Sequence, residues 1–242
     1  MKILITGGSS DLAQEIICSD IFSEHEFYIT CSNEVNLQKM IKHLAQKGKS
    51  VQGFVYNFKT PLSKDQMPDN IDALILNAAS VQKKILPLHL LSDDVVQNSL
   101  EDIWGNLKII KELLPQMIEK NFGRVIFISS LSTQNGTSSY APYIAAKSAI
   151  EGVMKNISVD YAKYNILANT LRLGLFKTSR NKIFWKRDFY QTKVQEHILQ
   201  SRMGNPSDIL LPINLFLSSQ LYTTGSTLNL GGGLPTVDFS KL

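Results

Sequence analysis

Short apolar runs alternate with longer stretches of helical spacing along most of the chain. Seven runs are rich enough in apolar, β-branched and aromatic residues to form buried strands, at residues 2–6, 27–31, 50–56, 73–76, 124–129, 166–171 and 226–230. Five stretches repeat apolar positions three and four residues apart and predict helices, at residues 11–22, 36–47, 100–120, 143–164 and 207–218. Strands that alternate with helices indicate βαβ units around a parallel sheet.

One segment departs from this alternation of strands and helices. Residues 175–200 carry six basic and two acidic side chains, together with five aromatic ones, and show no strand pattern of their own. The basic excess of this segment equals the formal net charge of the whole chain, +4, so the charge is local. We expect residues 175–200 to form an insertion over one end of the sheet.

Composition narrows the class of protein. The 242 residues are 43% hydrophobic and 19% charged, which fits one globular domain and excludes a disordered chain. A net charge of +4 is too small for a general nucleic-acid binder, so no nucleic-acid partner is expected. Cys18 and Cys31 are too few for a disulfide framework, and the apolar run at residues 3–5 is too short for a signal or membrane-spanning segment. We therefore expect a soluble, cytoplasmic protein without a membrane partner.

The first predicted strand runs into a glycine turn. Residues 6–13 read TGGSSDLA and lead into the first predicted helix. A tight turn of this kind points backbone amides and a helix N-terminus at a pyrophosphate. The same residues also fit an ordinary strand-to-helix turn capped by Ser10 or Asp11, so the motif gains weight only from the residues further along the chain.

Tyr143 and Lys147 stand four residues apart on a predicted helix and therefore share one of its faces. A free tyrosine has a pKa of about 10, and a nearby ammonium favours the phenolate. We expect Lys147 to bring the Tyr143 pKa toward the working pH, where a proton donor and acceptor is most effective. A helix-surface pair with a buried phenol is the structural alternative.

Several further motifs follow in a fixed order. They are Asn77-Ala78-Ala79 after the fourth strand, Asn106 in the long helix, Ser130 after the fifth strand, Tyr143 with Lys147, Asn169 with Gly174 and Thr178, and Thr224-Gly225 before Gly231-Gly232. Together with the glycine turn, they resemble the short-chain dehydrogenase/reductase family over residues 2–233. The resemblance implies a single doubly wound Rossmann-type α/β domain over residues 1–242, with a parallel seven-stranded sheet and with residues 175–200 as a substrate lid.

The resemblance also implies roles for individual residues. It makes Tyr143 the acid/base, Ser130 a hydrogen-bond donor to the reacting oxygen, Lys147 a ribose ligand, and Asn106 the holder of a water that relays protons through Lys147. Ser130, Tyr140 and Tyr143 would meet the substrate. Tyr140 has no lysine four residues on, so it either lines the substrate side or packs. The cofactor would be bound by Gly7, Ser9, Ser10, Asp11, Leu12, Ser32, Asn33, Asn57, Phe58, Asn77, Ala78, Ala79, Tyr143, Lys147, Gly174 and Thr178.

This chain departs from the family pattern in its glycine turn. Asp11 and Ala13 replace two glycines. Because a carboxylate beside a pyrophosphate would repel it, we expect the Asp11 side chain to turn back and cap the helix amides. Alanine needs little space at the last position, so Ala13 is compatible with the packing of helix against strand.

Cofactor choice depends on the end of the second strand. Ser32 and Asn33 stand where NAD enzymes carry an acid that binds the ribose hydroxyls. We therefore expect NADP(H) to be preferred over NAD(H), with Ser32 and Asn33 as phosphate donors. Glu34 would argue for NAD if it bends inward, whereas a solvated loop acid would argue for neither.

Two classes of function remain open. The first is an NAD(P)(H)-dependent oxidoreductase that reduces a carbonyl or oxidises a secondary alcohol, similar to 3-oxoacyl-carrier-protein reductases or to dehydrogenases of sugar nucleotides. The second is a catalytically impaired regulator or scaffold that still binds cofactor. The basic lid favours a small anionic substrate. The helices bearing Asn106 and Tyr143 are apolar on more than one side, so a second apolar stripe needs a partner besides the sheet; the resemblance implies that this partner is a second subunit, in a homodimer or homotetramer. The four histidines lack the spacing of a metal site.

Overall fold

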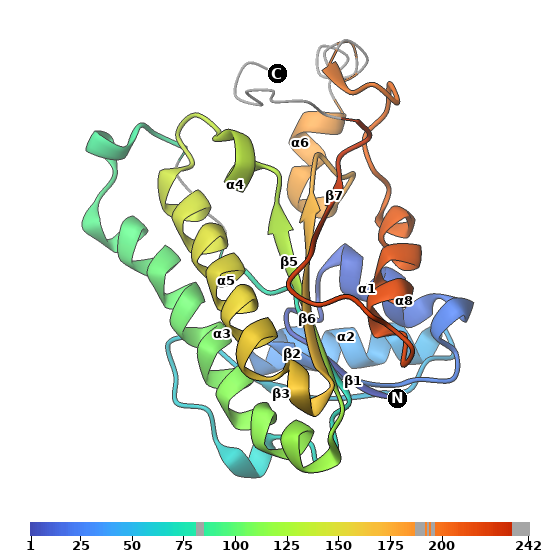
Figure 1. Cartoon of the computed structure of the whole chain (residues 1–242). Coiled ribbons are helices and arrows are strands. Elements are labelled where there is room, and N and C mark those ends of the chain that lie inside the picture. The colour runs from blue at the N-terminus through green and yellow to red at the C-terminus, as the bar shows by residue number, and fades with distance from the viewer. Residues whose placement is uncertain (81–84, 187–191, 193, 195–196, 234–242) are drawn as a thin grey trace.

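The seven strands form one parallel sheet. The computed structural model describes residues 1–80, 85–186, 192, 194 and 197–233. The strands are β1 (Lys2–Ile5), β2 (Glu26–Cys31), β3 (Val51–Val55), β4 (Ala73–Leu76), β5 (Gly123–Ser130), β6 (Ile166–Leu173) and β7 (Thr227–Leu230). They pair in the order β3-β2-β1-β4-β5-β6-β7, and every pair is parallel (Figure 1). The expected seven-stranded parallel sheet is confirmed.

Helices cover both faces of this sheet. The helices of the described residues are α1 (Asp11–Cys18), α2 (Glu34–Gln46), α3 (Asp93–Lys120), α4 (Ser132–Asn135), α5 (Ala141–Asp160), α6 (Lys182–Trp185) and α8 (Leu210–Leu217). Figure 1 shows α3 and α5 on one face and α1, α2 and α8 on the other, which is the doubly wound arrangement. Among the described residues, no helix combines the length and the apolar character needed to cross a membrane.

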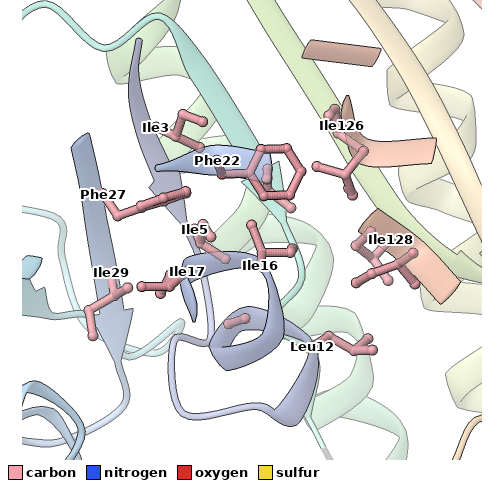
Figure 2. Packing of buried hydrophobic residues seen from close by; sticks show 14 of the residues in the cluster. Ile3, Ile5, Leu12, Ile16, Ile17, Phe22, Phe27, Ile29, Ile126 and Ile128 are labelled. Carbon is pink, nitrogen blue, oxygen red and sulfur yellow. The ribbon is translucent and has the colours of Figure 1, made fainter. Parts of the chain in front are cut away.

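The apolar runs of the strands supply both halves of the core. Ile3 and Ile5 of β1 pack with Ile16 and other residues of α1, as Figure 2 shows, whereas Leu4 between them joins the core under α3 and α5. Successive side chains of a strand point to opposite faces. A strand covered on both faces therefore reads as a continuous apolar run rather than an alternating one, which is why short apolar runs located these strands.

Several helix boundaries differ from the sequence-based prediction, and those of α3 and α1 show the physical reason. Helix α3 begins at Asp93 rather than at residue 100, because Ser92 takes the N-cap position and Asp93 and Asp94 place negative charge in the first turn. The helix expected at 11–22 ends at Cys18 instead. Ser19 is extended there, and a separate 3-10 turn follows.

The order of the strands places a crevice at one edge of the sheet. The chain moves outward from β1 to β2 and β3, then returns to β4 beside β1 and moves outward in the other direction. Ligands of open α/β sheets bind at such a reversal, beyond the carboxyl ends of the strands. Because all seven strands are parallel, the residues that follow each of them gather at this edge.

The described part of the expected lid lies over that edge. After β6, the chain forms a bridge between Phe176 and Gly204, a 3-10 turn η5 (Ser179–Asn181) and the short helix α6. Phe176 is buried in the core, and the Trp185 indole donates a hydrogen bond to the Thr178 carbonyl at 3.0 Å. Lid residues 187–191, 193, 195 and 196, including the basic Arg187 and Lys193, lie outside the described residues.

Candidate active site

The glycine turn packs tightly between two neighbouring strands. Gly7 has a φ of +69°, a left-handed conformation that glycine adopts without strain. A Cβ at Gly8 would lie 2.5 Å from Cβ of Ile29 on β2, and one at Gly7 would lie 3.0 Å from Cα of Ala78. Both glycines are therefore required for the turn to lie this close to β2 and to the segment after β4.

Ser10, and not Asp11, caps helix α1. The Ser10 hydroxyl accepts a hydrogen bond from the Ala13 amide at 3.1 Å, and the Ser10 backbone is extended as an N-cap requires. Asp11 is already the first helical residue, so the prediction that it caps the helix is wrong. Its carboxylate instead accepts hydrogen bonds from the backbone amide and the hydroxyl of Ser179, both at 2.7 Å. Asp11 thus ties the glycine turn to the lid.

Asn77 holds the glycine turn in place. Its side-chain amide donates to the Thr6 carbonyl at 3.0 Å, the Gly7 carbonyl at 3.1 Å and the Ser10 hydroxyl at 2.9 Å. The Thr6 hydroxyl in turn accepts from the backbone amides of Asn77 and Ala78. The segment after β4 and the turn after β1 are therefore one rigid unit.

The residues expected near the adenine end have other contacts of their own. The Asn33 side-chain oxygen caps α2 by accepting from the Asn36 amide at 2.9 Å, so only its nitrogen remains for a phosphate. Ser32 is exposed, and Glu34 lies exposed in the first turn of α2, where it accepts from Gln38. Of the two alternatives for Glu34, an inward-bent acid or a solvated one, the structure shows the solvated acid. It lies in the first turn of a helix rather than in a loop.

The other expected cofactor residues lie at the same edge of the sheet. They differ in which of their groups are already engaged in contacts within the protein. The Asn57 side chain accepts from the Lys59 amide at 3.1 Å, and the Phe58 ring packs edge-on against Tyr56. Leu12 has its side chain in the core, which leaves its backbone alone for a ligand, whereas Ser9 is exposed. The backbone amide of Gly174 donates to the Leu230 carbonyl, and that of Thr178 donates to the Phe176 carbonyl.

The four expected catalytic side chains converge from three elements. Asn106 lies on α3, Ser130 ends β5, and Tyr143 and Lys147 share one face of α5. A small cavity is lined by Asn106, Tyr143 and Lys147 and by Ala78, Ala79, Asp102, Ala146 and Ile150. The Tyr143 hydroxyl has a hydrogen bond with Ser130, and the buried Lys147 ammonium donates to the Ile128 carbonyl at 2.8 Å.

Asn106 has one unsatisfied atom in this cavity. Its side-chain nitrogen donates to the Asp102 carbonyl one turn earlier in α3, at 2.7 Å. Its side-chain oxygen is buried and has no hydrogen-bond partner. Such an orphaned acceptor is costly unless a water or ligand pairs with it. The free Asn106 oxygen could therefore accept a hydrogen bond from a water, which is the role expected for this residue.

The electrostatics of Tyr143 differ from the sequence-based expectation. Burial raises the pKa of Tyr143 and outweighs the opposing hydrogen bond from Ser130 and the charge of Arg180. Burial also lowers the pKa of Lys147 to about 8. The prediction that Lys147 brings the Tyr143 pKa downward was wrong for the net direction, because it neglected the desolvation of both side chains.

Three charged residues near the site could not be singled out from the sequence as parts of it. Asp102 is 7% exposed, and it lines the cavity four residues before Asn106 on the same helix face, a spacing visible in the sequence. Arg180 of the lid donates to the Ala79 carbonyl at 3.3 Å and acts electrostatically on Tyr143. Glu151, one turn after Lys147, pairs with Arg172 of β6. Only the three-dimensional contacts single these residues out from other charges.

Tyr140 packs against the predicted acid/base. Its ring lies edge-on to that of Tyr143, with ring centroids 6.1 Å apart. Tyr140 occupies the N-cap position of α5, and Pro142 follows inside the first turn, where its missing amide costs nothing. The start of α5 is therefore well defined, and Tyr143 lies in the first turn of this helix.

Comparisons with known proteins agree with this geometry. The family model described as short chain dehydrogenase matches residues 1–188. The human protein named dehydrogenase/reductase SDR family member 4 is 25% identical over 217 residues, which cover 86% of this chain and 78% of that protein. The 3-oxoacyl-[acyl-carrier-protein] reductase FabG of Haemophilus influenzae is 26% identical over 96% of this chain and 98% of its own length.

Solved structures show the same fold. A 3-oxoacyl (acyl-carrier-protein) reductase from Agrobacterium tumefaciens C58, crystallised with NADP, superposes with a TM-score of 0.86. The superposition covers 96% of this chain and 93% of that one, at 21% sequence identity. At this identity, the likeness establishes the arrangement of the elements.

Proposed function

The chain belongs to the short-chain dehydrogenase family, and on that basis we propose that it is an NAD(P)(H)-dependent oxidoreductase in which Tyr143 is the acid/base. The reaction reduces a carbonyl or, in reverse, oxidises a secondary alcohol. The observation that carries the proposal is the cavity shared by Asn106, Tyr143 and Lys147, at the sheet edge where α/β proteins bind nucleotides.

The chain's own residues fit a dinucleotide. The glycine turn and the N-terminus of α1 offer backbone amides to a pyrophosphate, and Lys147 and Asn106 would lie toward the ribose and nicotinamide. When bound, the nicotinamide supplies or accepts a hydride at the reacting carbon. The Tyr143 hydroxyl gives its proton to the reacting oxygen, while Ser130 donates a hydrogen bond to the same oxygen.

The test of this function is a spectrophotometric assay of a panel of carbonyl compounds with NADPH and NADH. We expect Tyr143→Phe to lower kcat by about 100- to 10,000-fold, as loss of a general acid does, while cofactor binding is retained. Tyr161→Phe is the matched control, because it removes a phenol at the opposite end of the same helix and should retain most turnover. If Tyr143→Phe changes nothing measurable, the chain is a cofactor-binding regulator or scaffold instead.

We propose NADP(H) as the preferred cofactor. No carboxylate is contributed by Ser32 or Asn33 at the end of β2, and the nearby Glu34 is engaged with Gln38 on the surface of α2. A 2′-phosphate would therefore meet hydroxyl and amide donors rather than a negative charge. A lower KM for NADPH than for NADH supports this preference, and the reverse order contradicts it.

The substrate is proposed to be anionic, which is the charge favoured by the basic lid. Arg180 supports this proposal, because it acts electrostatically on Tyr143, Lys147 and Asp102. Arg180→Gln should raise KM for an anionic carbonyl substrate by about 10-fold, as loss of a charged hydrogen bond does, and leave KM for a neutral one unchanged. Lys182→Gln, an exposed change in the same lid, is the control; equal effects of both variants contradict a specific role for Arg180.

We also propose a homodimer or homotetramer in the cytoplasm. Two large apolar side chains of α3, Leu100 and Trp104, are 49% and 62% exposed and form the surface available to a second copy. Cys18 and Cys31 are both free thiols, as in a reducing compartment. Light scattering coupled to size-exclusion chromatography measures the mass, and a monomer would contradict the assembly.

A further inference from the structure

Helix α3 brings a carboxylate into the active-site cavity. Asp102 is 7% exposed, and its two carboxylate oxygens accept hydrogen bonds from the Ser80 backbone amide at 2.7 Å and the Ser80 hydroxyl at 2.5 Å. Its backbone carbonyl accepts from Asn106. The position of Asp102 is therefore set by both α3 and the segment that follows β4.

A buried carboxylate is costly unless a cation compensates its charge. Ser80 supplies neutral donors only, so the two hydrogen bonds position the carboxylate without neutralising it. Burial consequently raises the pKa of Asp102, against the opposing hydrogen bonds of Ser80 and the charges of Lys147 and Arg180. A carboxylate buried in this place therefore needs a cationic partner within the cavity.

Lys147, in turn, is a buried cation that needs an anion. Its ammonium is buried and donates to the Ile128 carbonyl, whereas an ammonium carries three donors. Lys147 and Asp102 line the same cavity. The centre of a water molecule can move within about 10 Å³ of it, so the cavity has room for about one water. The orphaned Asn106 oxygen lies in the wall of this cavity. One water would meet a cation, a carboxylate and an amide oxygen there.

The other charges around Lys147 do not serve as its counter-charge. Arg180 of the lid is a cation and acts against the ammonium, and Tyr143 precedes Lys147 on α5 as a neutral phenol whose pKa is raised. Glu151, one turn later on α5, favours the ammonium but is engaged by the guanidinium of Arg172. Among the described residues with a resolved influence on Lys147, Asp102 is the strongest group that favours its charged form.

We propose that Asp102 is the counter-charge of Lys147: a positioning residue that acts across the shared cavity to hold the lysine as an ammonium and so governs the pH range of proton transfer at Tyr143. The catalytic part of this statement rests on the proposed function. The pairing of the two charges does not, because it is a property of the folded chain.

The proposal predicts the direction in which the pH profile moves. Asp102 raises the pKa of both Lys147 and Tyr143. Removing its charge therefore lets both groups lose their protons at lower pH. Reduction of a carbonyl needs the protonated phenol, so its alkaline limb should move to lower pH by about one unit, the lower end of the effect of a nearby opposite charge.

The kinetic test compares Asp102→Asn with Ser80→Ala. Asp102→Asn keeps the shape and removes the charge, whereas Ser80→Ala removes a hydrogen bond to Asp102 and keeps the charge. We expect the kcat profile of Asp102→Asn to shift by about one pH unit and that of Ser80→Ala to keep its wild-type limb, whatever its kcat. A lowered kcat in Asp102→Asn with an unshifted limb would show a structural role only and overturn the proposal.

A second readout needs no turnover. Because the folded pKa of Lys147 is about 8 against 10.5 for the free side chain, the unfolded chain holds this proton more tightly, and the free energy of unfolding should rise with pH between these values. In Asp102→Asn this rise should begin at lower pH, and in Lys147→Met and in the double variant it should be absent. Urea titrations of the cofactor-free protein from pH 7 to 10.5 measure it.

The two readouts separate the proposals. If wild-type protein shows no NAD(P)(H) turnover, the proposed function fails, while the unfolding titrations still decide the pairing of charges. If the titrations of wild type and Asp102→Asn have the same dependence on pH, the pairing fails even when the enzyme is active. Circular dichroism of each variant establishes that it is folded before either measurement is made.

Discussion

The ion pair between Glu151 and Arg172 ties helix α5 to the sheet, and its removal should cost a large part of the stability. The Glu151 carboxylate accepts from Arg172 Nε at 2.9 Å and Nη2 at 2.6 Å, from the Ser129 hydroxyl at 2.6 Å and from the Thr133 hydroxyl at 2.9 Å. The side chains of Glu151 and Arg172 are 8% and 21% exposed. We choose Glu151→Gln, which keeps the shape and removes the charge.

The size of the loss follows from what is left behind. The new amide group would place a donor against the guanidinium of Arg172, which would keep its charge with little water. Removing one partner of a buried pair costs about 3–5 kcal/mol. Because Arg172 is partly solvated, we expect the lower end, about 3 kcal/mol, which corresponds to a fall in Tm of about 6–12 °C for a chain of this length.

The assay is thermal and urea unfolding at fixed protein concentration, because assembly also affects the midpoint. Glu101→Gln is the matched control: its partner Lys59 is 3.2 Å away on the surface, and exposed pairs contribute about 0–1 kcal/mol. A loss below about 1 kcal/mol for Glu151→Gln, equal to that of the control, would refute the reasoning.

The same pair predicts a pH dependence. Burial acts to raise the pKa of Glu151, but the hydrogen bonds from Arg172, Ser129 and Thr133 together outweigh it and lower that pKa from its ordinary 4.5. A lowered pKa stabilises the fold above pH 4.5, and this stabilisation is lost as the pH falls through the folded value. The difference between wild type and Glu151→Gln should therefore shrink below pH 4.5.

Three further changes test other contacts. Gly8→Ala would place a Cβ 2.5 Å from Cβ of Ile29, so the turn must shift; we expect a loss of about 1–3 kcal/mol in urea unfolding and weaker NADPH binding by calorimetry. Asp11→Ala removes both hydrogen bonds to Ser179, and trypsin should then cleave the lid faster, whereas an unchanged rate would mean that the contact does not restrain it. Arg124→Met removes a fully buried guanidinium that donates to carbonyls of the chain after α8, and Tm should fall because those carbonyls lose their partners.

The sequence alone was sufficient to predict the sheet. The strand at 73–76 was located to the residue, because a parallel strand covered on both faces must be apolar at every position and stands out from its neighbours. The boundaries of α3 and α1 were less predictable. They depend on which serine becomes extended at a cap, and several serines in the chain are equally suited by type.

What the sequence determined about the site is local: the four-residue spacing that places Tyr143 and Lys147 on one helix face, and the glycines that permit the turn after β1. What only the tertiary structure decided is non-local. Asp11 meets Ser179 across 168 positions of the chain, Asp102 meets Ser80 across 22, and the pKa of Tyr143 rises because folding removes water from it. Spacing along a helix is a property of the backbone, whereas burial and charge pairing exist only after distant segments have packed together.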